Sequence, residues 1–242
     1  MSVDPNRPTG SSTAPAKSVS EALRTRQSGR AFLPTPVPLA TVTELLDLAR
    51  WAPSGSNIQP WRAHALSGAP LQAVVDETMT MAKAGQVPEQ EYLYYANPLP
   101  EVYLQRRRAN GWGLYGHLSI GKGDRVASTA QALRNFTFFG APVALFFFID
   151  AGLEKGSWVD YGMFLQSFML AARERGLHTC PQAAWLPYHA LARRHCGMDE
   201  GWTLVCGMAL GHLDTTEYVN GFRTPRLPVS DFLSSNGFQD AQ

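Results

Sequence analysis

Ala52-Pro53-Ser54-Gly55-Ser56-Asn57-Ile58-Gln59-Pro60-Trp61 is the stretch of this chain that says most about its fold and its chemistry. It separates an apolar helical pattern from a predicted strand, and its hydroxyl and amide side chains stand between two prolines. Proline fixes the backbone on either side of the turn, so the hydrogen-bonding groups are held in place. A stiff polar turn that ends in tryptophan favours a site for a flat aromatic ligand with polar edges.

Two arginines stand four residues apart upstream of this turn, in Arg26-Gln27-Ser28-Gly29-Arg30-Ala31-Phe32. Guanidinium groups bind phosphate through paired, charge-assisted hydrogen bonds. The segment therefore predicts an anion site. The alternative interpretation is that these cations stabilise the end of the preceding helix.

Hydrophobic periodicity and turn residues predict helices and strands that are mixed along the chain, which is typical of the α+β class. Capping boxes at Ser18 and Thr41 predict the starts of the first two helices, and Gly176 predicts the end of the last one. The predicted helices cover residues 18–27, 41–51, 71–84, 123–138 and 158–175, and the predicted strands cover residues 61–67, 143–150, 178–184 and 203–210.

Two further blocks, residues 164–177 and 207–212, complete a pattern of four segments. In this order the segments resemble the FMN-dependent nitroreductases over roughly residues 18–240, and the middle of the chain is most similar to the nitrobenzoate-reductase branch. The resemblance implies an α/β sandwich in which helices flank a central mixed sheet. It also implies a homodimer with two flavin sites between its subunits.

The apolar helix over residues 158–175 is the candidate for the dimer seam. Its residues Met163, Phe164, Phe168 and Met169 give more apolar surface than one helix face needs. The alternative is a central core helix within one subunit.

The resemblance implies that FMN is bound by residues from four segments. These residues are Arg26, Gln27, Ser28 and Arg30; Pro53, Ser54, Ser56 and Asn57; Pro181, Gln182 and Ala183; and Arg223 and Arg226. The first group matches the block for the phosphate, ribityl chain and pyrimidine edge, and the last matches C-terminal phosphate-binding cations. The second group matches a turn that reaches the flavin of the other subunit, although a helix stop would show the same residues. The third group would offer backbone N–H groups to flavin N5 and O4, where they stabilise negative charge.

Two positions depart from the family pattern. Relatives often have arginine or histidine where this chain has Gln27, and some have lysine where it has Thr224. We expect Arg223 to substitute for that lysine.

The implied reaction needs no catalytic side chain, because the flavin carries the hydride. NADH or NADPH would reduce FMN, and a small aromatic acceptor such as a nitroarene or nitrobenzoate would then occupy the same place in a ping-pong cycle. Other acceptors on the same fold (enones, quinones, flavins or halogenated aromatics) remain open, and so does a flavin-binding protein without turnover.

The composition fits one ordinary domain over residues 18–242: the chain has 242 residues, of which 45% are hydrophobic and 17% charged. A net charge of +1 favours neither nucleic acid nor an anionic membrane as a partner. Residues 1–17 lack the apolar core of a secretory signal and are predicted to be a disordered tail. The three cysteines form no disulfide or metal pattern and are expected to be thiols in the cytoplasm, and no metal site is expected.

Residues 85–122 are long for a connection and rich in aromatic and basic residues. We expect an excursion with short helices that covers the flavin, with Tyr103, Arg107 and Trp112 as substrate contacts; the alternative is a flap over apolar surface. The motif Gly111-Trp112-Gly113-Leu114-Tyr115-Gly116 fits G-x-G-x-x-G but follows no strand, so we reject a dinucleotide loop there.

Overall fold

A computed structural model describes residues 11–238 of the chain and shows one central sheet. The four strands are β1 (Arg62–Ser67), β2 (Val143–Asp150), β3 (His178–Gln182) and β4 (Trp202–Gly211). Their order across the sheet is β1-β2-β4-β3, and each adjacent pair is antiparallel. The predicted strands are confirmed to within a few residues. The prediction of a mixed sheet is corrected, because the parallel pairing found among the described residues is a single bridge between Ser28 and Thr179.

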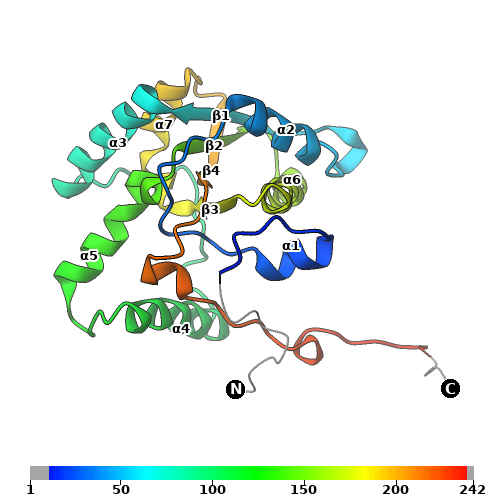
Figure 1. Cartoon of the computed structure of the whole chain (residues 1–242). Helices are drawn as coiled ribbons and strands as arrows, with labels where there is room; N and C mark the ends of the chain where they lie inside the picture. Colours follow the sequence, from blue (N-terminus) through cyan, green and yellow to red (C-terminus); the bar gives the residue numbers. More distant parts are fainter. Residues whose placement is uncertain (1–10, 239–242) are drawn as a thin grey trace.

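Strand β2 divides the core into two halves because its residues point alternately to the two faces of the sheet. Phe146 and Phe148 pack with Trp185 on one face, whereas Phe147 packs with Phe164 and other apolar residues on the opposite face. All of these side chains are buried. The fold is therefore a sheet with a helical layer on each side, as the α+β prediction requires (Figure 1).

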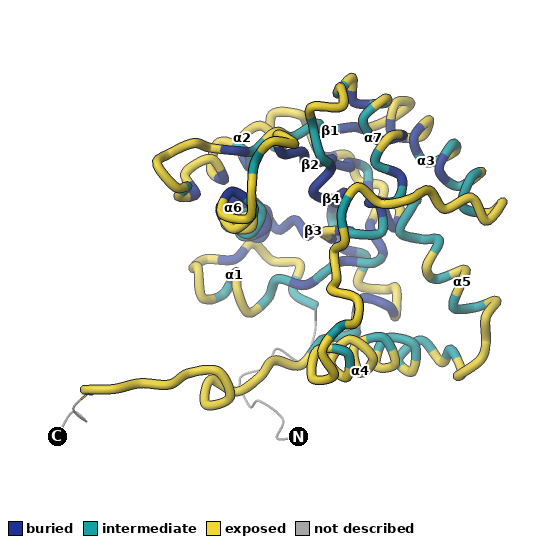
Figure 2. Tube along the Cα trace, turned by 180° about the vertical axis from the view of Figure 1, so that it is seen from behind, coloured by how far each residue is buried: buried dark blue, intermediate teal, exposed yellow. Residues whose placement is uncertain are grey.

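Different pairs of helices cover the two faces of the sheet. One face is covered by α2 (Leu39–Ala49) and α6 (Lys155–Glu174), and the other by α3 (Gly68–Lys83) and α7 (His189–Cys196). Figure 2 shows that buried segments gather around the strands and that the outer sides of these helices are exposed. No described helix is both long enough and apolar enough to cross a membrane.

The two predicted helix starts have different outcomes. Helix α1 (Val19–Thr25) begins as predicted, because the Ser18 side chain accepts a hydrogen bond from the Glu21 N–H. Helix α2 begins earlier than predicted, at Leu39 after Pro38, so Thr41 is not its cap. Pro38 is the N-cap residue, with extended backbone angles, and the helix starts without a capping side-chain hydrogen bond.

Residues 11–17, which the sequence assigns to a disordered tail, are packed against the domain. The buried Arg173 donates hydrogen bonds to the carbonyls of Ser12 (3.0 Å) and Ala14 (2.8 Å), and Ala16 is itself buried. Burial lowers the pKa of His178 to about 4, and its Nε2 lies 2.9 Å from the Ser12 carbonyl. A buried arginine must be paired with acceptors, and this segment supplies them. Residues 1–10 lie outside the described residues.

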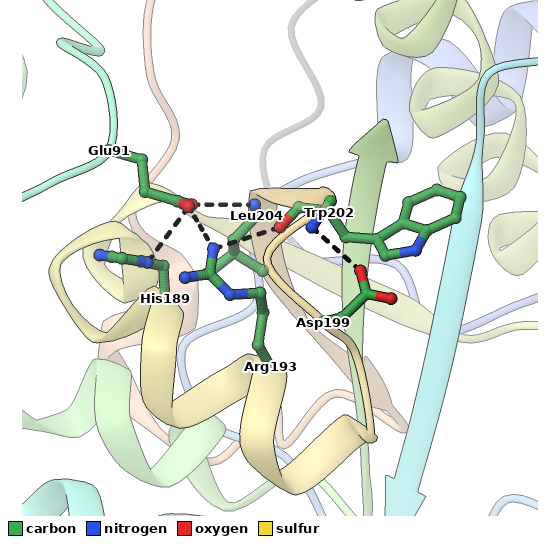
Figure 3. Close-up of polar contacts among 7 residues, drawn as sticks. Glu91, His189, Arg193, Asp199, Trp202 and Leu204 are labelled. Carbon is green, nitrogen blue, oxygen red and sulfur yellow. Dashed lines mark hydrogen bonds and ion pairs between the residues drawn. The ribbon is translucent and has the colours of Figure 1, made fainter. Parts of the chain in front are cut away.

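The excursion over residues 85–122 is anchored at its start. The Glu91 carboxylate faces His189 and Arg193 of α7 and accepts a hydrogen bond from the Leu204 N–H (Figure 3). The Tyr92 hydroxyl donates to the Val205 carbonyl over 3.1 Å. These contacts fix the base of the excursion to α7 and to the start of β4.

The rest of the excursion is largely helical and exposed. It contains α4 (Glu101–His117), which is longer than the short helices predicted, and α5 (Arg125–Leu133) follows it within the predicted helix over residues 123–138. Neither helix has a buried residue. His117 at the end of α4 stacks on Tyr218 with ring centroids 4.1 Å apart. The glycine-rich motif lies inside α4 rather than in a loop between a strand and a helix.

Gly207 of β4 should tolerate no larger residue. A Cβ at this position would lie 2.5 Å from Cδ1 of the fully buried Trp185, which is stacked on Phe138. We expect Gly207→Ala to lower the free energy of unfolding by about 1–3 kcal/mol, the usual cost of overpacking a core. Chemical denaturation measures this. Gly116→Ala is the control, since a Cβ there meets no atom within 4 Å, and equal stability losses for both variants would contradict the packing argument.

Candidate functional site

The segment from Arg26 to Arg30 lies along one edge of β3. Ser28 forms a bridge with Thr179, and the Gly29 N–H donates to the Thr179 carbonyl over 3.0 Å. A Cβ at Gly29 would lie 2.7 Å from the Phe32 ring, so the packing of Phe32 against this segment requires glycine. The exposed Pro181 follows on the same strand, at an edge where a residue without an N–H is tolerated. The structure thus brings the first and third groups of predicted site residues together.

The segment after β4 joins this cluster from the other end of the chain. The Asn220 side chain accepts a hydrogen bond from the Arg30 N–H (2.8 Å) and donates to the Ala31 carbonyl (2.8 Å). Arg223 donates to the Arg24 carbonyl over 2.6 Å, at the end of α1. The fourth predicted group therefore meets the first.

The cluster carries positive charge that carboxylates do not neutralise. The pKa of Arg26 is lowered by burial and by the nearby charge of Arg226. Within residues 11–238, no ion pair with an acidic residue is found for Arg26, Arg30 or Arg226. Arg26 and Arg30 are partly buried and Arg226 is exposed. Cations without an acid partner in a partly desolvated place attract an anion, so the cluster suits an anionic ligand.

Gln27 lies in this cluster, but its amide is directed at the protein. The side chain is buried, and its Nε2 donates to the Ser11 hydroxyl (2.8 Å) and to the Asn220 carbonyl (3.1 Å). Its Oε1 accepts a hydrogen bond from Arg223 over 2.5 Å. Gln27 and Arg223 therefore join three segments of the chain, whereas Arg26, Arg30 and Arg226 form no ion pair with an acidic residue in the described part of the chain.

The end of β3 is held by a second buried amide. Gln182 is 3% exposed, and its Nε2 donates to the Asn135 carbonyl over 2.7 Å. Its backbone N–H faces the Cys206 sulfur and partly offsets the effect of burial, which raises the pKa of that thiol to about 12. The next residue, Ala183, begins a short 3-10 helix. The backbone at these positions is thus rigid.

The turn after α2 lies away from this cluster. Ser56 and Asn57 have left-handed backbone angles, with φ of 51° and 58°, each of which costs about 1–3 kcal/mol in a non-glycine residue. The Gly55 N–H donates to the Asp160 carboxylate (3.0 Å), and Ser54 Oγ accepts from the Gln59 N–H (3.0 Å). Within the described part of the chain, no hydrogen bond, ion pair or ring contact joins this exposed turn to Arg26. One subunit therefore does not bring the second predicted group to the other three.

The predicted substrate contacts are on α4, next to the segment that completes the cation cluster. A Cβ at Gly113 would touch Phe222 at 3.2 Å. Tyr103 and Trp112 are about half exposed, and the Arg107 guanidinium lies 4.4 Å from the centre of the Tyr95 ring. These side chains do not contact the cations within one subunit.

Other parts of the described structure add no second site of this kind. No group of histidine, cysteine or acidic side chains among residues 11–238 could hold a metal ion. The three cysteines are buried and free, and burial raises the pKa of Cys180 to about 11. A surface cavity of about 330 Å³ is lined by other residues, among them Thr13, His212 and Asp214.

Sequence reasoning missed the residues that assemble the cluster. Asn220, Ser11 and Asn135 carry no motif, and their partners lie far away along the chain. An asparagine before a glycine is a turn signal, and this is the signal that Asn220 gives. Its role appears only when the segments meet.

Comparison with known proteins agrees with this arrangement. The model of the nitroreductase family matches residues 23–212. A 4-nitrobenzoate reductase from Pseudomonas putida is 41% identical over 214 residues, which cover 88% of this chain and 93% of the relative.

Two solved structures are also similar. The FMN- and NADPH-dependent nitroreductase NfnB of a Sphigopyxis strain is 37% identical, with a TM-score of 0.88 over 91% of this chain and all of that one. NfnB of Mycobacterium smegmatis, an FMN-dependent enzyme solved in complex with NADPH, is 30% identical, with a TM-score of 0.85 over 90% of this chain and 97% of that one. The chain, with its cations gathered at one edge of an antiparallel sheet, belongs to the nitroreductase family.

Proposed function

We propose that this protein is an FMN-dependent NAD(P)H oxidoreductase that reduces nitroaromatic compounds. The observation that carries the proposal is the cluster of Arg26, Arg30 and Arg226 beside the edge of β3, in a member of the nitroreductase family. A flavin phosphate needs such cations, and a flavin ring needs rigid backbone donors close by.

The residues present fit these needs. Arg26 and Arg226 would hold the phosphate, and Ser28 and Arg30 would contact the ribityl chain and the pyrimidine edge. The backbone N–H of Ala183 would face the ring, where a fixed donor stabilises negative charge, whereas the N–H of Gln182 faces the Cys206 sulfur. When bound, FMN supplies hydride transfer between a nicotinamide and an acceptor. The protein positions these partners and excludes water, so no side-chain acid or base is required.

The similar proteins support the choice of acceptor and donor. One relative is named a 4-nitrobenzoate reductase, another, from Comamonas testosteroni, a chloronitrobenzene nitroreductase, and a similar structure was solved with NADPH. We therefore propose nitroarenes, with nitrobenzoates among them, as acceptors and NADPH or NADH as the donor.

An anaerobic titration tests the proposal. The purified protein should be yellow and should release FMN, not FAD, on denaturation. NADPH or NADH should bleach the flavin absorbance, and addition of nitrobenzoate should restore it. A protein that takes up no FMN, or whose bleached flavin no nitroarene reoxidises, would refute the proposal.

We further propose that the protein acts as a homodimer and that the turn at Ser54–Asn57 completes the site of the partner subunit. Its strained backbone and exposed polar side chains are unexplained within one subunit. Of the predicted seam residues, Phe164, Phe168 and Met169 are buried in the core of one subunit, so the apolar surface of α6 that is left for a partner is that of the exposed Val159 and Met163. Both features are accounted for if two copies pack through this side.

Mixed dimers test the shared site. Arg26→Ala should weaken FMN binding by about 1.5–3 kcal/mol through the loss of a charge-assisted contact, and Asn57→Ala should lower activity from the other side. Because the two residues would serve one site from different subunits, an Arg26→Ala/Asn57→Ala mixed dimer should regain one intact site. Activity measured after subunit exchange checks this. Arg50→Ala is the control and should leave FMN binding unchanged, since Arg50 is exposed and paired with Asp47. If verified mixed dimers recover no activity, each site lies within one subunit.

We also propose that α4 selects acceptors with an acidic substituent. Arg107 lies over the Tyr95 ring and Arg106 over the Tyr103 ring, so neither guanidinium is paired with a carboxylate in the described structure. Arg108 differs, because it lies 3.9 Å from the Glu101 carboxylate.

The neighbouring arginines supply a matched test. Arg107→Ala should lower the preference for nitrobenzoate over nitrobenzene by about tenfold or more, since a charge-assisted hydrogen bond to the carboxylate is worth roughly 1.5–3 kcal/mol. The measurement is kcat/KM for the two acceptors. Arg108→Ala should leave the ratio unchanged. If the Arg106, Arg107 and Arg108 variants all keep the wild-type ratio, α4 does not recognise the carboxylate.

A further inference from the structure

We propose that Asn220 and Gln27 are positioning residues that hold the arginines of the cluster together as one phosphate-binding unit. This inference rests on the FMN function proposed above and deepens it. Neither residue need touch the flavin: each acts through the cation-bearing segments that it joins.

Asn220 uses every polar atom of its side chain and its carbonyl for this purpose. Its Oδ1 accepts from the Arg30 N–H, and its Nδ2 donates to the carbonyls of Ala31 (2.8 Å) and Asp214 (2.7 Å). Its backbone carbonyl accepts from Ser11 Oγ (2.7 Å) and from Gln27 Nε2 (3.1 Å). The side chain is 2% exposed, so loss of these bonds would leave buried groups unsatisfied.

Gln27 forms the second junction. Its Oε1 accepts from Arg223, which also donates to the carbonyls of Arg24 (2.6 Å) and Thr25 (3.3 Å) at the end of α1. The C-terminal segment that carries Arg226 is therefore tied to the segment that carries Arg26 on both sides of Gly221.

The need for these junctions follows from charge. Burial and the nearby charge of Arg226 lower the pKa of Arg26, and like charges favour separation of the two segments that carry them. An acidic residue could join them, but it would cancel the charge that attracts phosphate. Asn220 and Gln27 are neutral amides with donors and acceptors, so they hold the cations together without neutralising them.

Flavins with and without a phosphate distinguish this role from simple stability. The wild-type apoprotein should bind FMN more tightly than riboflavin, as measured by quenching of flavin fluorescence. Asn220→Ala should weaken FMN binding about tenfold or more and change riboflavin binding by much less. Gln27→Glu should show the same selective loss because it adds a negative charge, although it keeps an acceptor for Arg223; this variant keeps the inference testable if Asn220→Ala does not fold.

Tyr161→Phe is the matched control. The Tyr161 hydroxyl is buried and lies within hydrogen-bond distance of the carbonyls of Arg62 (3.0 Å) and Phe148 (2.9 Å), away from the cation cluster. This variant should lower Tm and leave the ratio of FMN to riboflavin affinities unchanged. If the Asn220 and Gln27 variants lose affinity for both flavins equally, or keep the wild-type ratio, the inference is overturned. A wild-type protein with no preference for FMN would overturn the proposed phosphate site as well.

Discussion

The pairing of β2 with β4 is the constraint on which the rest of this structure depends. It runs from Val143–Leu210 to Asp150–Trp202 and places the aromatic residues of β2 in two separate cores. A strand that is buried on both faces must lie inside the sheet, with its neighbours and helices around it. This leaves β3 at the edge, where backbone groups are open to pairing. The segment from Arg26 to Arg30 uses that edge, so the position of the cation cluster follows from the order of the strands.

In the cation cluster, unfavourable charge is opposed by hydrogen bonds that hold the segments together. Arg26 is partly buried and lies near the charge of Arg226, and both effects disfavour its charged form when no anion is bound. Neutral amides at Gln27 and Asn220 and backbone carbonyls at the end of α1 hold the segments together. The left-handed backbone at Ser56 and Asn57 is a second unfavourable feature, and the contacts described within one subunit do not explain its strain. Both features are explained if a bound anion and a partner subunit complete the site.

The excursion over residues 85–122 is held by contacts near its two ends and is exposed between them. Glu91 ties its start to α7 and β4, and His117 ties the end of α4 to Tyr218. Between these points α4 buries no residue. Segments with few buried contacts open at low free-energy cost, so α4 can move more easily than the two ends of the excursion.

The sequence by itself determined what depends on neighbours along the chain. The apolar run of β2 predicts a buried strand at residues 143–150, and Ser18 caps α1 as the capping box predicts. The motifs around Arg26 and Ser54 led to the family, which the comparisons confirm. Tertiary structure decided what depends on residues that are far apart: the antiparallel sheet, the packing of residues 11–17 on Arg173, and the use of Gln27 as a support. Asn220 meets Arg30 across 190 positions, and no local pattern encodes such a contact, because its partners become neighbours only when the sheet has formed.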